Sequence, residues 1–335
     1  METQPKVSVI VPIYNARPYL SHCLETLVHQ TLEDLELILV LDCPTDGSDE
    51  IAEEYARKYD NIRLIRNERN LHASESRNRG LKIARGEYVG FSDADDFQEL
   101  RMYEDMYRTA KREDADVVLV DRLSCTPEKC EPVSYARQIQ VQGGREFLKE
   151  NLLSLIRGDS KLYASWLYTH LYRRKFIEDA GFSLFDSRKI MAEDLLFNIQ
   201  VYHRLLQQDG KLVYLPQAYY YYMVYEGSLC HSMSFYTFDM TVPLLVQICR
   251  EMTGSKVLSE TELNRALGAR ITDKLYSAFC KEVRMFGVFA SCRHLMKHRK
   301  IEELASALKK YGVWYDARLP LKKNIFGYLL RALMG

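Results

Sequence analysis

The chain has 335 residues, of which 47% are hydrophobic and 27% are charged, and this balance is typical of a folded globular protein rather than a disordered or fibrous one. Its 46 basic and 46 acidic residues cancel, which argues against nucleic acid as a partner because nucleic-acid-binding proteins usually carry a basic excess. The charge is nevertheless unevenly spread, since residues 293–335 include 10 basic and 3 acidic side chains.

Short apolar segments alternate with segments of helical periodicity in the first third of the chain. The apolar segments are rich in β-branched residues, as expected of strands covered on both faces. Strands separated by helices indicate an α/β fold with a mainly parallel sheet, which binds ligands at the carboxyl ends of its strands. We expect strands at 7–11, 35–41, 62–65, 87–92 and 116–121 and helices at 20–28, 48–59, 77–84 and 100–111, with Pro12 ending the first strand.

The order of elements is looser in the rest of the chain. We expect helices at 143–156 and 192–206, a strand at 211–225 that contains the four tyrosines 219–222, and mainly helices from about residue 238. The tyrosine run is expected to be sheet rather than a cofactor site. We therefore divide the chain into an α/β domain at 1–230 and a helical C-terminal region at 231–335.

The C-terminal region ends in an amphipathic segment. Leu321, Ile325, Leu329 and Leu333 fall on one helical face, and basic residues flank this apolar stripe. A helix of this kind is suited to lie on an anionic membrane surface, although packing against the protein's own core explains the same pattern. We expect a cytoplasmic protein that binds peripherally to the inner face of the cell membrane through this helix.

Two further features bear on location. Residues 1–6 are polar and lead directly into a strand, without the apolar stretch of a secretory signal, and no segment has the length of a membrane span. The eight cysteines form no Cys-x-x-Cys pair and no Cys/His cluster, which predicts reduced thiols in a cytoplasm. Cys125 and Cys130 are the closest pair, but no second pair completes a zinc site, so we expect ordinary thiols there as well.

An acidic cluster, Asp93-Ala94-Asp95-Asp96, directly follows an expected strand. Carboxylates this close together repel one another unless a cation or hydrogen-bond donors neutralise them, which predicts oxygen ligands for Mg²⁺ or Mn²⁺. The alternative is a solvated loop that caps the next helix at its positive N-terminus. The motif by itself does not decide between the two.

Polar residues also follow the first two strands. Tyr14 and Asn15 close the first and Asp42 closes the second, so an aromatic ring, an amide and a carboxylate are expected at adjacent strand ends. Such a group could hold a planar heterocycle, with Asp42 accepting an imide N–H. Each segment alone looks like an ordinary turn. Farther along, Glu193 and Asp194 stand at an expected helix start, where acidic residues also simply favour the helix dipole.

Taken in order, these motifs resemble the family 2 glycosyltransferases of the GT-A fold. The resemblance covers roughly residues 5–230, and the order of the motifs is more specific than any one of them. It is carried by residues 7–15, by Asn70 with residues 76–80, by 86–96 and by 192–194.

The resemblance implies a donor site for a nucleotide sugar, built at the strand ends. Four residues would surround the nucleotide base: Pro12, Tyr14, Asn15 and Asp42. Arg77 would approach the base or the diphosphate. Asp93 and Asp95 would hold the ribose and a divalent metal ion, Mn²⁺ or Mg²⁺, with Asp95 as the direct metal ligand.

The same resemblance implies an inverting transfer to an acceptor hydroxyl. Asp194 would be the general base and Glu193 its neighbour in the acceptor site, for a glycan or lipid-linked glycan acceptor of surface polysaccharide synthesis. The aromatic segment 165–172 looks like the family's acceptor segment, although core packing explains aromatic residues equally well. A non-catalytic nucleotide-binding or membrane-associated subunit of the same fold is the alternative function.

The chain departs from the family pattern at two positions. Leu41 stands where the family often has an aspartate, and His72 stands where a glycine is common. Because Asp42 is kept, a uracil or thymine base is still expected.

Overall fold

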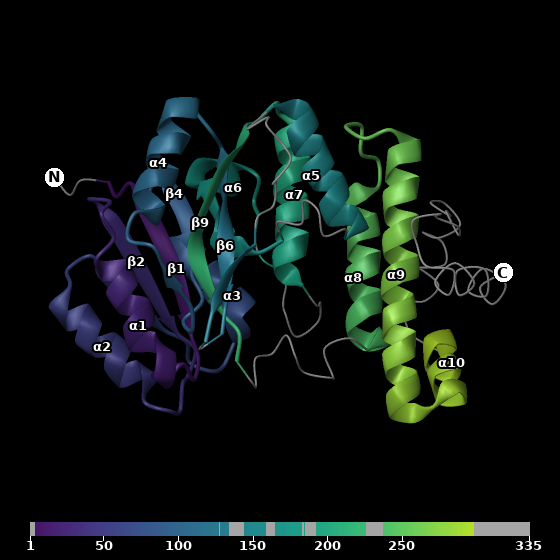
Figure 1. The fold of residues 1–335 in the computed structure, drawn as a ribbon, viewed down its shortest axis with the longest axis horizontal. Coiled ribbons are helices and arrows are strands. Elements are labelled where there is room, and N and C mark those ends of the chain that lie inside the picture. The colour runs from purple at the N-terminus through teal and green to yellow at the C-terminus, as the bar shows by residue number, and fades with distance from the viewer. Residues whose placement is uncertain are drawn as a thin grey trace.

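The computed structural model describes residues 4–126, 128–133, 144–158, 165–182, 184, 192–225 and 237–297. In this part of the chain one mixed sheet forms the centre of the α/β portion (Figure 1), with strand order β3-β2-β1-β4-β8-β6-β9-β5 and with β7 paired to β6. The strands are β1 (Val7–Ile13), β2 (Leu35–Leu41), β3 (Ile62–Arg66), β4 (Tyr88–Phe91), β5 (Phe97–Gln98), β6 (Val117–Cys125), β7 (Cys130–Val133), β8 (His170–Arg173) and β9 (Leu212–Met223).

Within the described residues four of the eight strand pairs are parallel, including all those among β1, β2, β3 and β4, as the sequence predicts. β1 pairs in parallel with both β2 and β4, β2 with β3, and β6 with β9. The expected strands agree with the observed ones to within a few residues. Three strands were not expected: β5 and β7, which pair antiparallel with β9 and β6, and β8, which lies antiparallel between β4 and β6. The insertion of β8 brings the aromatic segment 165–172 into the middle of the sheet.

The prediction that Pro12 ends the first strand is wrong. β1 continues to Ile13, and Pro12 pairs in register with Val40 of β2. Proline is tolerated because β1 pairs with β4 only as far as Ile10, so the strand has an open side beyond that point and no ladder bond needs the missing N–H.

Helices cover both faces of the sheet (Figure 1). Val9 and Val11 of β1 pack in one buried cluster with residues of α1, α2 and α4, whereas Ile10 packs in a second cluster with α5 and α7. This alternation follows from the two-residue period of a strand. The helices are α1 (Arg17–Val28), α2 (Ser48–Lys58), α3 (His72–Ile83), α4 (Met102–Glu113), α5 (Arg145–Arg157), α6 (Arg174–Asp179) and α7 (Glu193–Gln207).

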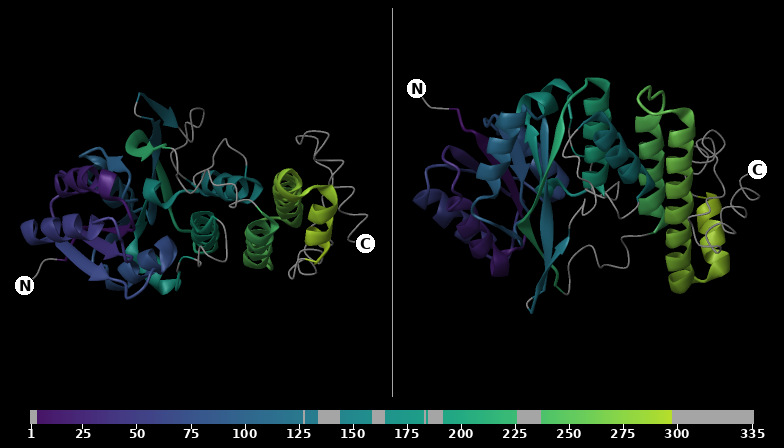
Figure 2. Two further views of the ribbon diagram at one scale, coloured as in Figure 1. Left: turned by 90° about the horizontal axis from the view of Figure 1, so that it is seen from below. Right: turned by 45° about the horizontal axis from the view of Figure 1, so that its top comes forward.

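Three more helices follow, α8 (Phe238–Met252), α9 (Glu260–Phe286) and α10 (Val288–Lys297). α8 contacts α7 and α9 contacts α5, so α8 and α9 form a further layer on the side of α5 and α7 away from the sheet (Figure 2). Within the described ranges no helix has both the length and the apolar character to cross a membrane. The amphipathic segment expected near the C-terminus lies outside the described residues.

The expectation of reduced thiols is wrong for one pair of cysteines. Cys125 and Cys130 form a disulfide, with their Cα atoms 4.1 Å apart. They stand directly opposite each other where β6 and β7 pair as antiparallel strands, so the turn between these strands brings the two side chains together. Spacing along the chain did not reveal this pairing because it depends on the register of the two strands.

Candidate active site

The candidate site lies where the carboxyl ends of β1, β2 and β4 meet the first turns of α3 and α7. The loop after β4 carries Asp93, Asp95 and Asp96, and α7 begins with Glu193 and Asp194. Parallel strands end at the same edge of a sheet, which is why loops distant in the sequence share this edge. The structure therefore places the predicted acidic residues of two separate motifs at one edge.

Arg77 of α3 lies at the centre of these acidic residues and is 6% exposed. Its Nη2 atom is 2.5 Å from Asp93 Oδ1, and its Nη1 atom is 3.5 Å from Asp194 Oδ1 and 3.6 Å from Glu193 Oε1. Burial lowers the pKa of Arg77, but attraction from the three carboxylates outweighs this effect and raises the pKa above its ordinary value. Among the described residues one cation thus faces three carboxylates, and negative charge remains in excess.

The pKa of Asp194 is raised by burial and by the negative charge around it. Burial, with added repulsion from Glu193 and Asp93, raises the pKa of this carboxyl to about 7, even though Arg77 and the backbone N–H of Leu167 oppose the shift. A carboxylate whose pKa lies near neutral pH is matched to accept a proton during catalysis. Asp194 therefore has the titration behaviour expected of a general base.

Asp95 and Asp96 differ in what holds them. Asp96 is 2% exposed, and it accepts hydrogen bonds from Tyr220 Oη at 2.9 Å and from the Met223 backbone N–H at 2.8 Å. Asp95 accepts one from Tyr225 Oη at 2.6 Å. Asp96 thus anchors the acidic loop to β9, while Asp95 lies closer to the edge of the site.

The tyrosines of β9 belong to this arrangement, and the sequence analysis missed their role. The run 219–222 is sheet, as predicted. However, the Tyr220 hydroxyl also accepts a hydrogen bond from the Asp93 backbone N–H at 3.0 Å, and the Tyr225 ring stacks on Tyr19 with centroids 4.9 Å apart. The strand pattern indicated a sheet, but no local signal showed that its hydroxyls reach the acidic loop.

The acidic loop suits a divalent ion whose remaining ligands come from the substrate. Burial, with repulsion from Asp93, raises the pKa of Asp95, and a cation would relieve both penalties. In the part of the chain that the structure describes, no three acidic, His or Cys side chains gather as a complete metal cage. Mg²⁺ is usually bound by one or two carboxylates together with substrate phosphates and water, so Asp95 and Asp93 suit such an ion.

The predicted base-binding residues lie at the neighbouring strand ends. Asp42 is 2% exposed, and its Oδ1 atom accepts hydrogen bonds from Asn67 Nδ2 and from the Leu71 backbone N–H, each at 2.7 Å. Among the described residues none donates to its other oxygen, Oδ2. Asn67 was not predicted from the sequence, yet it holds Asp42 in position.

The other three predicted residues lie at the carboxyl end of β1 or directly after it. Asn15 has a left-handed backbone (φ 48°), and its Oδ1 atom accepts a hydrogen bond from the Thr45 backbone N–H at 2.8 Å, which ties the loop after β1 to the loop after β2. Tyr14 is 51% exposed, and Pro12 is half-buried at the end of β1. The structure thus brings Asn15 and Asp42 into adjacent loops.

The two halves of the site are linked through α3. Asn67 Nδ2 also donates to Ser76 Oγ at 2.9 Å, and Ser76 is the neighbour of Arg77. His72 begins α3 with a positive φ of 66°, a conformation that suits the glycine common at this position in the family and that costs energy for histidine. The departure at His72 therefore leaves the backbone turn in place.

The aromatic segment also borders the site. The Leu167 backbone N–H bonds to Asp194, and the Tyr168 ring stacks on Tyr220 with centroids 4.1 Å apart. Trp166 lies in the same stack, 6.3 Å from Tyr168. These contacts are consistent with a place beside the acceptor, although the segment also fills the core.

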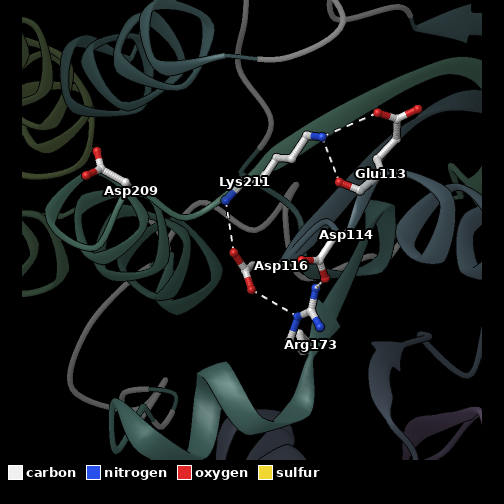
Figure 3. Close-up of a pocket in the computed structure, with 6 residues that line it drawn as sticks. All are labelled: Glu113, Asp114, Asp116, Arg173, Asp209 and Lys211. Carbon is white, nitrogen blue, oxygen red and sulfur yellow. Dashed lines mark hydrogen bonds and ion pairs between the residues drawn. The ribbon is translucent and has the colours of Figure 1, made fainter.

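A cavity of about 550 Å³ lies at the opposite edge of the sheet (Figure 3). None of the predicted site residues lines it. Its charged groups are joined to one another, for example Arg173 to Asp114 at 2.6 Å and Lys211 to Glu113 at 3.3 Å. The lining residues are Glu113, Asp114, Asp116, Arg173, Asp209 and Lys211.

Comparison with known proteins gives information on the family and on the fold. The family model described as Glycosyl transferase family 2 matches residues 8–180. The uncharacterized glycosyltransferase EpsJ of Bacillus subtilis is 33% identical over 67% of this chain and 63% of its own length. The poly(ribitol-phosphate) beta-glucosyltransferase of Bacillus spizizenii is 38% identical over 34% of this chain and 18% of its own length. Both matches span less than two thirds of the relative.

Solved structures support the fold. TarS 1-349 of S. aureus in complex with UDP superposes with a TM-score of 0.68 at 22% identity, covering 98% of this chain and 88% of that one. Its complex with UDP-GlcNAc gives 0.64 at 24% identity, covering 91% and 80%. The GT-A-like α/β fold with added C-terminal helices is therefore confirmed.

Proposed function

The chain belongs to glycosyl transferase family 2, and from that membership we propose that it is an inverting glycosyltransferase. It moves a hexosyl or N-acetylhexosaminyl group from a UDP-linked sugar to a hydroxyl of a glycan or lipid-linked glycan in surface polysaccharide synthesis. The observation that carries the proposal is the convergence of Asp93, Glu193 and Asp194 on Arg77, with the pKa of Asp194 at about 7.

Asp194 acts as the general base. In its deprotonated form it takes the proton of the acceptor hydroxyl as that oxygen attacks the anomeric carbon from the face opposite the nucleotide. Arg77 stays charged beside it and holds the carboxylate in place at 3.5 Å. Glu193 lies next to Asp194 on the first turn of α7 and borders the acceptor.

Asp42 recognises the nucleotide base. Hydrogen bonds from Asn67 and the Leu71 backbone fix the orientation of this buried carboxylate through Oδ1. Oδ2 can then accept the imide N–H of uracil, with Tyr14, Asn15 and Pro12 around the ring. The complexes of TarS with UDP and with UDP-GlcNAc support a UDP-linked donor.

Asp95 and Asp93 would hold a divalent ion, Mn²⁺ or Mg²⁺. When bound, the ion supplies Lewis-acid stabilisation of the charge on the departing diphosphate. Asp95→Ala should therefore weaken UDP binding in the presence of Mn²⁺ by roughly tenfold or more, because the variant lacks the carboxylate that joins ion and protein. Titration calorimetry with and without Mn²⁺ measures this, and equal Mn²⁺-dependent affinity in both proteins would remove Asp95 from the metal site.

We also propose that the protein works at the inner face of the cell membrane. Phe286 and Phe289, at the turn between α9 and α10, are 59% and 88% exposed. Basic side chains are frequent in the segment that begins at Arg293. Aromatic and basic side chains together suit binding to an anionic bilayer surface.

Donor screening tests the proposed activity. UDP, GDP and ADP are titrated in the presence of Mn²⁺, and UDP-sugars are then incubated with lipid-linked and free glycans while released UDP is measured. We expect that, of the three nucleotides, only UDP binds tightly and that one UDP-sugar is turned over. The Asp42→Ala variant should lose the preference for UDP over GDP and ADP. Binding without any turnover would instead support the non-catalytic subunit.

A further inference from the structure

Arg122 of β6 is a second buried arginine on the side of the sheet that carries the site, and it differs from Arg77 in its partners. The exposed fraction of Arg122 is 9%. Its Nε and Nη1 atoms are buried, and neither has a hydrogen-bond partner among the residues that the structure describes. Within the described ranges no carboxylate forms an ion pair with it. Burial of a guanidinium without a counter-ion costs free energy of folding, unless a ligand pairs with its charge and accepts its hydrogen bonds.

Aromatic rings hold the Arg122 guanidinium. Its Cζ atom is 4.4 Å from the centroid of the Trp166 ring and 4.8 Å from that of the Tyr222 ring. Cation–π contacts use the faces of the guanidinium and leave its N–H groups, which lie in the plane, for hydrogen bonds. Oxyanions such as phosphate and carboxylate match this planar edge.

The position of Arg122 points to the acceptor side of the site. Trp166 directly precedes Leu167, whose backbone N–H bonds to the candidate base Asp194. Arg122 is also in register with Tyr220, the tyrosine that bonds to the acidic loop. The proposed metal ion would meet the charge of the donor diphosphate, so Arg122 is available to a different group.

We propose that Arg122 binds an oxyanion, a phosphate or a carboxylate, carried by the acceptor. This inference rests on the proposed transferase function. It narrows the acceptor to a negatively charged glycan or lipid-linked glycan. Trp166 and Tyr222 position the guanidinium, and its N–H groups contact the anion. A neutral acceptor would leave these N–H groups unpaired and would be a poorer substrate.

The first test needs no acceptor and no activity. The wild-type protein is labelled with ¹⁵N-arginine, and the Nε–H resonance of Arg122 is identified by its absence in Arg122→Lys. Titration with inorganic phosphate, and separately with acetate, should shift this resonance in a saturable way. The ion that binds with the higher affinity indicates whether the acceptor carries a phosphate or a carboxylate. A resonance that neither ion moves would overturn the proposal.

The second test separates acceptor from donor. Arg122→Gln should raise KM for an anionic acceptor by roughly tenfold or more, because hydrogen bonds to a charged group are lost. UDP affinity and acceptor-independent hydrolysis of the UDP-sugar should be unchanged. Arg122→Lys should restore part of the loss, and Arg112→Gln, on the exposed face of α4, serves as the matched control.

The outcomes are distinguishable. A fall in UDP affinity in Arg122→Gln would place the residue in the donor site and overturn the proposal. An equal rise in KM for neutral and anionic acceptors would do the same. Failure of the wild-type protein to bind UDP or to consume any UDP-sugar would contradict the proposed function instead, and the phosphate titration would still stand by itself.

Discussion

Two clusters of charged residues lie at opposite edges of the same sheet, and they differ in how their charges balance. At the carboxyl ends of the strands, Arg77 is the one cation of the described residues that pairs with Asp93, Glu193 and Asp194. At the other edge, around the cavity of Figure 3, acids and bases are paired with one another. There Arg173 contacts Asp114 and Asp116, and Lys211 contacts Glu113.

The pKa values move in opposite directions at the two edges. Burial and like-charge repulsion raise the pKa of Asp194 to about 7. Hydrogen bonds from Arg112 and Lys211 lower the pKa of Glu113, and one from Arg173 lowers that of Asp114. The number of acidic residues does not by itself make a cluster suitable for catalysis. What matters is how much of their negative charge has no paired cation, because that charge raises the pKa of the carboxyl groups.

The largest effect is expected at the unpaired cluster. Asp194→Asn should lower transfer by about 10²–10⁴-fold, the range typical of a lost general base, and should leave UDP affinity unchanged. Because the variant removes a repelling carboxylate, its free energy of unfolding should be unchanged or higher. Transfer rate, calorimetry and urea unfolding are measured on one preparation.

Asp209→Asn, at the paired edge, is the matched control and should keep wild-type turnover. Wild-type turnover in Asp194→Asn would exclude this residue as the base. A parallel loss of UDP binding would reassign it to the donor site.

Replacing the central arginine of each cluster shows how much each cluster contributes to the free energy of unfolding. Arg77→Met leaves three carboxylates without their cation, and loss of one partner of a buried ion pair costs about 3–5 kcal/mol. Arg173→Met breaks pairs that are partly exposed to solvent, and such pairs contribute only about 1 kcal/mol or less. The free energies of unfolding in urea at pH 7.5 measure the difference, and equal losses would contradict the comparison.

The pH dependence of transfer follows from Asp194. Because the base must be deprotonated, kcat/KM should rise with pH and level off above about 7, the pKa of this carboxyl. Glu193→Gln removes one source of repulsion, so the rising limb should move to lower pH. A profile that is flat between pH 5 and 9 in the wild-type protein, or unmoved in Glu193→Gln, would argue against the assignment.

The smallest effect is expected at a paired group between the C-terminal helices. His294 Nδ1 lies 2.8 Å from the buried carboxylate of Glu282, and its Nε2 lies 3.4 Å from Asp239. Burial lowers the pKa of His294, but its hydrogen bond to Glu282 and the attraction of Glu282 and Asp239 outweigh this effect and raise the pKa above its ordinary value. The pairing therefore stabilises the fold at low pH.

This stabilisation is complete below the unfolded pKa of about 6.5 and is lost as the pH rises through the higher folded pKa. The side chain of His294 is 37% exposed, so solvent screening limits the effect to less than about 1 kcal/mol. Urea unfolding of the wild-type protein and of His294→Gln at pH 5.5 and 8.5 measures it. A difference between the two proteins that grows with pH would contradict the sign.

The sequence by itself determined the features that depend on local pattern. Apolar, β-branched segments predicted most strands, and helical periodicity predicted most helices, because strands covered on both faces are apolar throughout and helices buried on one face show a regular apolar spacing. The alternation of the two predicted the mainly parallel sheet. The order of short motifs identified the family and placed Asp42, the acidic loop and Glu193-Asp194 at element ends. These residues are recognisable without coordinates because each motif occupies only a few consecutive positions.

Only the tertiary structure decided how these residues act on one another. Asp96 is hydrogen-bonded to Tyr220 of β9, Asp194 and Asp93 contact the same arginine, and Cys125 is paired with Cys130. Arg122 lies between two rings and has no counter-ion in the described part of the chain. Charge interactions and desolvation depend on distances between side chains that are remote in the sequence. No local pattern records those distances, because the register and order of the strands set them.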